Sequence, residues 1–213
     1  MNSELLSLIV LIGVVWGALA GIQALQTAQF GAEAEVRSLL DRVPRQRWHF
    51  IALEYCYGIL NRTYAVFVTD RMLSGAKVRG LLSAPTSPNQ RWRDPYFYPR
   101  TKLVTSYASL DPESPSFKAV HSSNFQLSMD QIERVEFDNA PKWGMGTVPY
   151  SGRIFLHLRS GAKRELILLG DQPGSELAER LRKEGIGRAP TKHTPDAAGA
   201  RRLRQESFAG PRS

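Results

Sequence analysis

One short segment of the sequence combines cations with aromatic rings. Residues 91–100 read RWRDPYFYPR. Guanidinium groups pair with phosphate and carboxylate oxygens, and Trp and Tyr rings favour the interface between water and lipid. We therefore treat the segment as a candidate contact site for an anionic lipid or a protein partner. Its candidate residues are Arg91, Trp92, Arg93, Tyr96, Phe97, Tyr98 and Arg100.

Side chains that carry catalysis or bind metals lack the spacing that such sites need. The four histidines are scattered and form no HExxH motif: His49, His121, His157 and His193. Gly144-Met145-Gly146 lacks the continuation of a phosphate-binding loop, and Ser151 is not part of a GxSxG motif. The sequence therefore predicts no catalytic residue, no metal site and no cofactor.

The composition is typical of one globular domain with appendages. The chain has 213 residues, of which 42% are hydrophobic and 23% charged. A net charge of +8 favours phospholipid headgroups, nucleic acid or an acidic protein as partner. Asp94 interrupts the basic segment and no RNP-type strand is present, which argues against nucleic acid. The lone Cys56 excludes an intramolecular disulfide.

An uncharged apolar segment near the start predicts a membrane anchor. Residues 5–25 read LLSLIVLIGVVWGALAGIQAL. As a helix they would extend roughly 31 Å, close to the thickness of the bilayer hydrocarbon. We predict a transmembrane helix over 1–27. The alternative is a signal peptide cleaved after Ala20, but no Lys or Arg precedes the apolar run, which favours the uncleaved anchor.

Charges after this segment predict its orientation. The first cations of the chain are Arg37, Arg42, Arg45 and Arg47. The positive-inside rule then places the rest of the chain in the cytoplasm, as a single-pass protein of the inner membrane. Residues 28–46 are predicted to continue as a helix and linker, with the helix ending before Pro44. Cleavage at Ala20 would instead give an exported protein.

From Trp48 onward the sequence has the pattern of strands, with turns at Asp70-Arg71 and Ser160-Gly161. The segment SELAERLRKEG then predicts an amphipathic helix that begins after Ser175 and ends at Gly185. The fold class is therefore α+β, with antiparallel strands closed by one C-terminal helix.

Two segments depart from this pattern. Residues 83–122 contain six prolines and are predicted to form a long insertion without regular elements. Its aromatic half should be ordered, because exposing so many rings to water is unfavourable. Residues 187–213 are rich in Arg, Pro, Gly and Ala and are predicted to be a disordered basic tail.

Several motifs resemble those of a known family. FQLSMDQIERVEF, IFLHLRSGAKRELILLG and ELAERLRKEG follow one another as in the C-terminal half of a bacterial pleckstrin-homology-like (PH-like) domain, and TYAVFVTDRMLSG resembles an earlier strand pair. The resemblance covers about residues 48–185, within a domain at 47–186, but the insertion and the segment WGMGTVPYSG depart from it. It implies an antiparallel barrel or sandwich capped by a helix, in a membrane-associated setting, and leaves the ligand open.

Together these observations predict a membrane-anchored, non-enzymatic binding module. Its cytoplasmic PH-like domain would contact anionic headgroups or a membrane protein through residues 91–100. An alternative is a structural or assembly subunit of a larger membrane complex. Within the segment, the rings could instead cover an open end of the barrel and leave only the arginines exposed.

Overall fold

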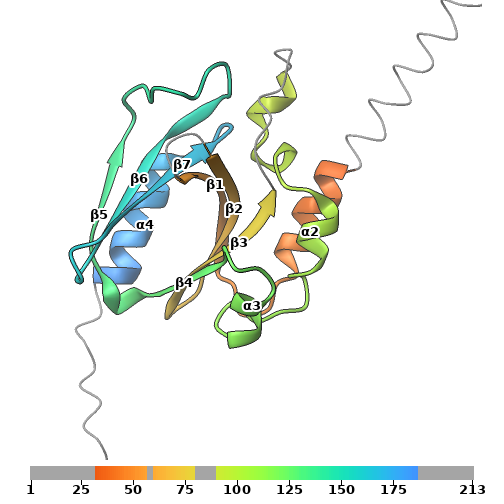
Figure 1. Ribbon diagram of the computed structural model, residues 1–213, viewed down its shortest axis with the longest axis horizontal. Coiled ribbons are helices and arrows are strands. Elements are labelled where there is room, and N and C mark those ends of the chain that lie inside the picture. Colours follow the sequence, from red (N-terminus) through yellow and green to blue (C-terminus); the bar gives the residue numbers. More distant parts are fainter. Residues whose placement is uncertain (1–31, 57–59, 80–89, 187–213) are drawn as a thin grey trace, which may run out of the picture.

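The strands form a curled antiparallel sheet (Figure 1). The computed structural model describes residues 32–56, 60–79 and 90–186. Within these ranges seven strands are ordered β4-β3-β2-β1-β7-β6-β5. Their bounds are β1 Trp48–Cys56, β2 Leu60–Val68, β3 Met72–Arg79, β4 Phe125–Ser128, β5 Ile132–Asp138, β6 Tyr150–Leu158 and β7 Lys163–Leu169. With the C-terminal helix α4 (Gly174–Ile186), they give the α+β organisation expected from the sequence.

Two hairpin turns lie where the sequence predicted them. Between β2 and β3, Thr69 Oγ1 accepts hydrogen bonds from the N–H groups of Arg71 (3.2 Å) and Met72 (2.9 Å). Between β6 and β7, Gly161 adopts a φ of 81°, which favours glycine. Both turns join antiparallel neighbours, so these two predictions are confirmed.

The central strands of the sheet are buried on both faces, whereas antiparallel sheets commonly leave one face to water. Successive residues of a strand point to opposite faces, yet Tyr64, Ala65, Val66 and Phe67 of β2 are each 0% exposed. On the concave face, α4 lies inside the curl (Figure 1) and contributes Leu177, Ala178 and Leu181 to the core.

The convex face is covered by two segments that are distant in sequence. One is a helix over 32–41, and the other is residues 90–124, which connect β3 to β4. Figure 1 shows both outside the curl, and we call them together the convex cover. Their buried side chains include Val36, Leu40, Tyr98, Val104, Tyr107 and Phe117, which pack against Phe67, Ala76 and Val78 of the sheet.

The insertion contains short helices, contrary to the prediction that its prolines exclude regular elements. They are η1 Gln90–Arg93, η2 Pro95–Phe97, α2 Thr101–Thr105 and α3 Pro115–Ala119. Pro95 and Pro115 begin two of them, because proline fits the first helical position. Asp94 and Ser114 cap these helices with their side chains.

Several predictions lie outside the described residues. They concern the transmembrane helix over 1–27, the alternative cleavage at Ala20 and the disordered tail over 187–213. Residues 32–41 form a helix that ends before Pro44, and its predicted continuation from the anchor lies outside the described residues. Among the described residues, no helix has both the length and the apolar character needed to cross a membrane.

Candidate functional site

The structure divides residues 91–100 into buried rings and exposed cations. Trp92 and Tyr98 are 3% and 1% exposed, and Tyr98 Oη donates a hydrogen bond to the carbonyl of Trp92 (2.8 Å). Arg93 and Arg100 are exposed. The side chain of Arg91 lies outside the part of the chain that the structure describes.

Tyr96 and Phe97 are half-buried and connect the segment to its neighbours. The Arg37 guanidinium, from the helix over 32–41, lies 3.9 Å from the centre of the Tyr96 ring. Phe97 meets the Tyr98 ring edge-on, with 5.7 Å between ring centres. The predicted contact residues therefore do not form one surface. Their rings pack inward against the sheet and the first helix, and two of their arginines face water.

A small hollow lies between the first helix and this segment. Its lining residues are Ala32, Glu33, Val36, Tyr96, Phe97, Pro99 and Thr101, and its volume is about 160 Å³. Pockets that enclose a small-molecule ligand usually measure about 300–1,000 Å³. The hollow is too small to enclose a phospholipid headgroup, so contact with a headgroup would be made on the surface by exposed cations.

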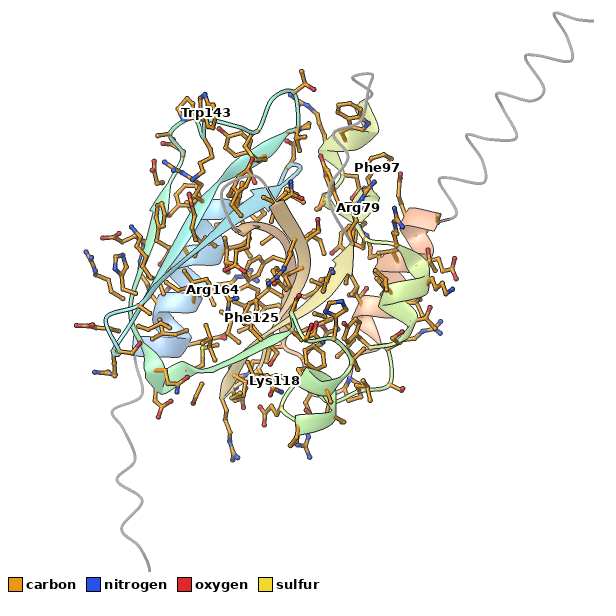
Figure 2. The ribbon with its side chains drawn as sticks, in the orientation of Figure 1. Arg79, Phe97, Lys118, Phe125, Trp143 and Arg164 are labelled. Carbon is orange, nitrogen blue, oxygen red and sulfur yellow. The ribbon has the colours of Figure 1, made fainter. Side chains whose placement is uncertain are left out.

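Arg79, at the end of β3, was not among the predicted residues. Its Nη1 donates a hydrogen bond to the carbonyl of Tyr98 (3.1 Å), which directs the guanidinium toward the 91–100 segment. Its Nε is buried and has no hydrogen-bond partner among the described residues. Burial, and secondarily the charge of Arg100, lower the pKa of Arg79. The backbone N–H of Arg100 donates to the carbonyl of Val78 (2.9 Å), the residue before Arg79, so the two arginines lie on adjacent pieces of chain, and an anion would offset their like charges. Figure 2 shows Arg79 and Phe97 on the same side of the view.

A sequence signal for Arg79 is hard to identify. Arg79 is the last residue of β3 and only one of many cations in the sequence. Because side chains alternate along a strand, it would be expected on the same face as Lys77, which does not distinguish it. A β-bulge at Thr63 and Tyr64 shifts the register where Arg79 pairs with β2. This irregularity, which the sequence does not reveal, accompanies the contact of its guanidinium with Tyr98.

His49 is the other titratable group at this site. Its Nε2 lies 3.0 Å from Tyr96 Oη, and its Nδ1 lies 3.8 Å from Asp41. Burial lowers the pKa of His49 and raises the pKa of Tyr96. Both shifts favour uncharged side chains near neutral pH. The pair is therefore suited to joining β1 to the convex cover rather than to moving protons.

A second group of cations includes Lys77 of β3 and Arg164 of β7. Lys77 Nζ is 3.3 Å from His121 Nε2, and Arg164 lies 3.6 Å from the centre of the Phe125 ring (Figure 2). Glu54 pairs with Arg164 through two hydrogen bonds of 2.7 and 3.0 Å. Because a carboxylate already pairs with Arg164, this group is less suited to an added anion than Arg79 and Arg100.

Comparisons with known proteins add little. No family model matches the chain, and no curated protein matches it. The C-terminal domain of an unknown protein from Leishmania infantum is similar in structure at 8% identity, over 66% of this chain and 84% of that one, with a TM-score of 0.37. The comparisons assign no family.

The structure also bears on metal binding. In the ranges it describes, no group of three or more His, Cys, Asp or Glu side chains could hold a metal ion. What the site does present is guanidinium groups: those of Arg93 and Arg100 at the surface, and that of Arg79 with a buried Nε that lacks a partner among the described residues.

Proposed function

We propose that the chain is a membrane-anchored, non-enzymatic binding module that contacts the phosphate groups of anionic lipids. The observation that carries the proposal is the pair Arg79 and Arg100. Arg100 is exposed, Arg79 has a buried Nε without a partner among the described residues, and burial together with the charge of Arg100 lowers the pKa of Arg79. A phosphate between them would accept hydrogen bonds from both guanidinium groups and offset their repulsion.

The position of this pair supports a lipid as the anion. Pro99 and Thr101, which flank Arg100, line the same hollow as Ala32 in the first turn of the helix over 32–41. Six residues, 26–31, separate this turn from the apolar run over 5–25 within the predicted transmembrane helix. If they are helical they extend about 9 Å. The arginine pair would then lie within reach of the headgroups.

The fold is compatible with a PH-like domain, which we include in the proposal. A curled antiparallel sheet with one C-terminal helix is what the sequence resemblance implies. We further propose that the domain lies on the cytoplasmic side, where anionic lipids attract cations by about 1 kcal/mol for each Lys or Arg near the surface. The predicted membrane anchor would raise the local concentration of headgroups around the domain, so that individually weak contacts would be enough for binding.

The test uses the full-length protein in a neutral maltoside detergent. Calorimetric titration with a soluble short-chain phosphatidylglycerol should show binding, and the matched phosphatidylcholine should bind more weakly. Arg100→Ala should weaken phosphatidylglycerol binding roughly fivefold, which corresponds to about 1 kcal/mol.

Lys118→Ala is the matched control. Lys118 is also an exposed cation of the convex cover, but Figure 2 shows it at the opposite end of the molecule from Phe97. Equal affinity for the two lipids, or equal losses in the two variants, would contradict the proposal. A protein partner that copurifies in fixed ratio, together with no lipid preference, would favour the assembly subunit instead.

A further inference from the structure

A loop at 139–149, between β5 and β6, exposes a tryptophan. Trp143 is 94% exposed. Among the described residues, the other large hydrophobic side chain that is exposed is Val120, at 41%. The loop reads NAPKWGMGTVP and contains no carboxylate. Tryptophan buries one of the largest apolar areas of any side chain, so an indole left almost wholly in water forgoes the stabilisation that this burial normally supplies.

The exposure of Trp143 does not result from a loose loop. On its C-terminal side, Met145 and Val148 are 4% and 5% exposed and belong to the core beneath the convex cover. Tyr55 Oη donates a hydrogen bond to Met145 Sδ (3.6 Å). Gly144 adopts a φ of 91°, which turns the chain inward directly after the indole.

The N-terminal side of the loop is held as well. Lys142 Nζ pairs with Glu165 at 2.8 Å, and the backbone N–H of Lys142 donates to Tyr150 Oη. Trp143 therefore lies between two fixed neighbours, Lys142 and Met145. Presenting the indole costs little further ordering of the backbone, as in a preorganised binding surface.

Gly170 and Asp171 connect the loop to the 91–100 segment through backbone hydrogen bonds. The N–H of Gly170 donates to the carbonyl of Pro149 (2.9 Å), and the N–H of Asp171 donates to the carbonyl of Arg93 (2.6 Å). In Figure 2, Trp143 and Phe97 both lie in the upper part of the molecule. Phe97 lines the hollow beside Ala32, so the first turn of the first helix belongs to the same end.

We propose that Trp143 inserts its indole into the interfacial zone of the bilayer that holds the anchor. This inference rests on the proposed function. Tryptophan prefers this zone, where its ring is shielded from water and its N–H still finds a partner. The absence of carboxylates from the loop removes repulsion by anionic headgroups. With the anchor as the first attachment, Trp143 supplies a second and fixes the orientation of the domain on the membrane.

Tryptophan fluorescence of the full-length protein in nanodiscs tests this inference. Lipids brominated in the upper acyl chain quench indoles in the bilayer interface, lipids brominated near the chain end quench indoles at the bilayer centre, and both leave indoles in water emitting. Trp143→Phe should abolish part of the quenching by the upper-chain lipids, and Trp16→Phe, which probes the centre of the predicted span, should abolish part of the quenching by the chain-end lipids. Because Trp143 packs against nothing that holds the loop, the variant should keep the wild-type unfolding temperature.

The two variants separate the inference from the proposed function. If Trp16→Phe reduces quenching and Trp143→Phe does not, the anchor is present but Trp143 does not reach the bilayer, and the inference is wrong. If Trp16 itself is not quenched, the anchor fails and the inference fails with it. Unquenched emission from Trp143 at shorter wavelength than in water would indicate a protein surface as its partner.

Discussion

On the concave face of the sheet, α4 supplies Leu177, Ala178 and Leu181 from one stripe of a regular helix, whereas the convex face is covered by an irregular connection and a separate helix. Together they bury both faces of the central strands, such as β2. The concave face is covered by a helix whose apolar periodicity is visible in the sequence. The convex side is closed by individual side chains, such as Phe117, that enter the core from short helices. The insertion between β3 and β4 is therefore as much a part of the hydrophobic core as the sheet itself.

The largest expected effect tests whether the convex cover is part of the core. Phe117 is 0% exposed and packs edge-on against Phe67, with 5.8 Å between ring centres. Phe117→Ala should lower the free energy of unfolding by about 3–5 kcal/mol, as expected for a buried aromatic ring. Denaturant unfolding of the full-length protein measures it. Leu181→Ala in α4 should cost a similar amount, about 2–5 kcal/mol.

Val120→Ala is the control for this pair, because Val120 is partly exposed in the same insertion. It should change the unfolding free energy by less than about 0.5 kcal/mol. If Phe117→Ala were equally mild while Leu181→Ala remained costly, the two faces would not be equivalent and the convex cover would be peripheral.

A smaller effect is expected at the polar junction between sheet and cover. Asn124 is 4% exposed and makes three hydrogen bonds through its side chain. Its Oδ1 accepts from the N–H of Lys77 (2.9 Å) and from Tyr107 Oη (3.1 Å). Its Nδ2 donates to the carbonyl of Phe117 (2.9 Å). Asn124→Ala leaves these groups unsatisfied and should cost about 2–3 kcal/mol. Tyr107→Phe removes one of the three bonds and should cost about 1 kcal/mol. Thermal unfolding would rank the two variants, and equal losses would count against this network.

The smallest effect is a pH dependence to which His49, on the convex side, contributes. Burial lowers the pKa of His49 below its ordinary value of 6.5, and nearby Asp41 and Arg37 act in opposite directions. The folded state therefore disfavours the protonated ring. As the pH falls below about 6.5, the unfolded chain binds a proton first, and stability decreases by up to about 1.4 kcal/mol per pH unit.

Unfolding measured between about pH 7.5 and about pH 5.5, above the range where carboxylates titrate, should show this decrease. His49→Gln should reduce the slope while keeping a hydrogen-bonding group near Tyr96. His121→Gln should reduce it separately, because burial and the charge of Lys77 also lower the pKa of His121. An unchanged slope in His49→Gln would contradict the assignment of this pH dependence to His49.

Much of the fold could be predicted because its signals are local. The continuous apolar run TYAVFV, unlike the alternating RIFLHLR, is typical of a strand covered on both faces, and β2 is such a strand. Turn residues and the stripe of α4 were equally visible. The predicted helix ending before Pro44 also lies where expected, as far as the structure describes it.

The candidate site was less predictable because its geometry depends on distant contacts. Composition identified residues 91–100, but whether Trp92 or Arg93 faces water depends on the sheet beneath them. Arg79 reaches Tyr98 beside a bulge in the pairing of β3 with β2. Trp143 is exposed because Met145 is drawn into a core built largely from other segments. The spacing of residues in the sequence does not predict these contacts or which side chains are exposed.

The connection between β3 and β4 also affects how the edge of the sheet assembles. Residues 80–124 must close before the four-residue strand β4 can pair with β3. Closing a loop roughly tenfold longer than a hairpin turn costs about 2 kcal/mol more in chain entropy. So short a strand recovers little of that cost by itself. We therefore expect β4 to join the sheet late in folding, together with the convex cover, and to leave it early in unfolding.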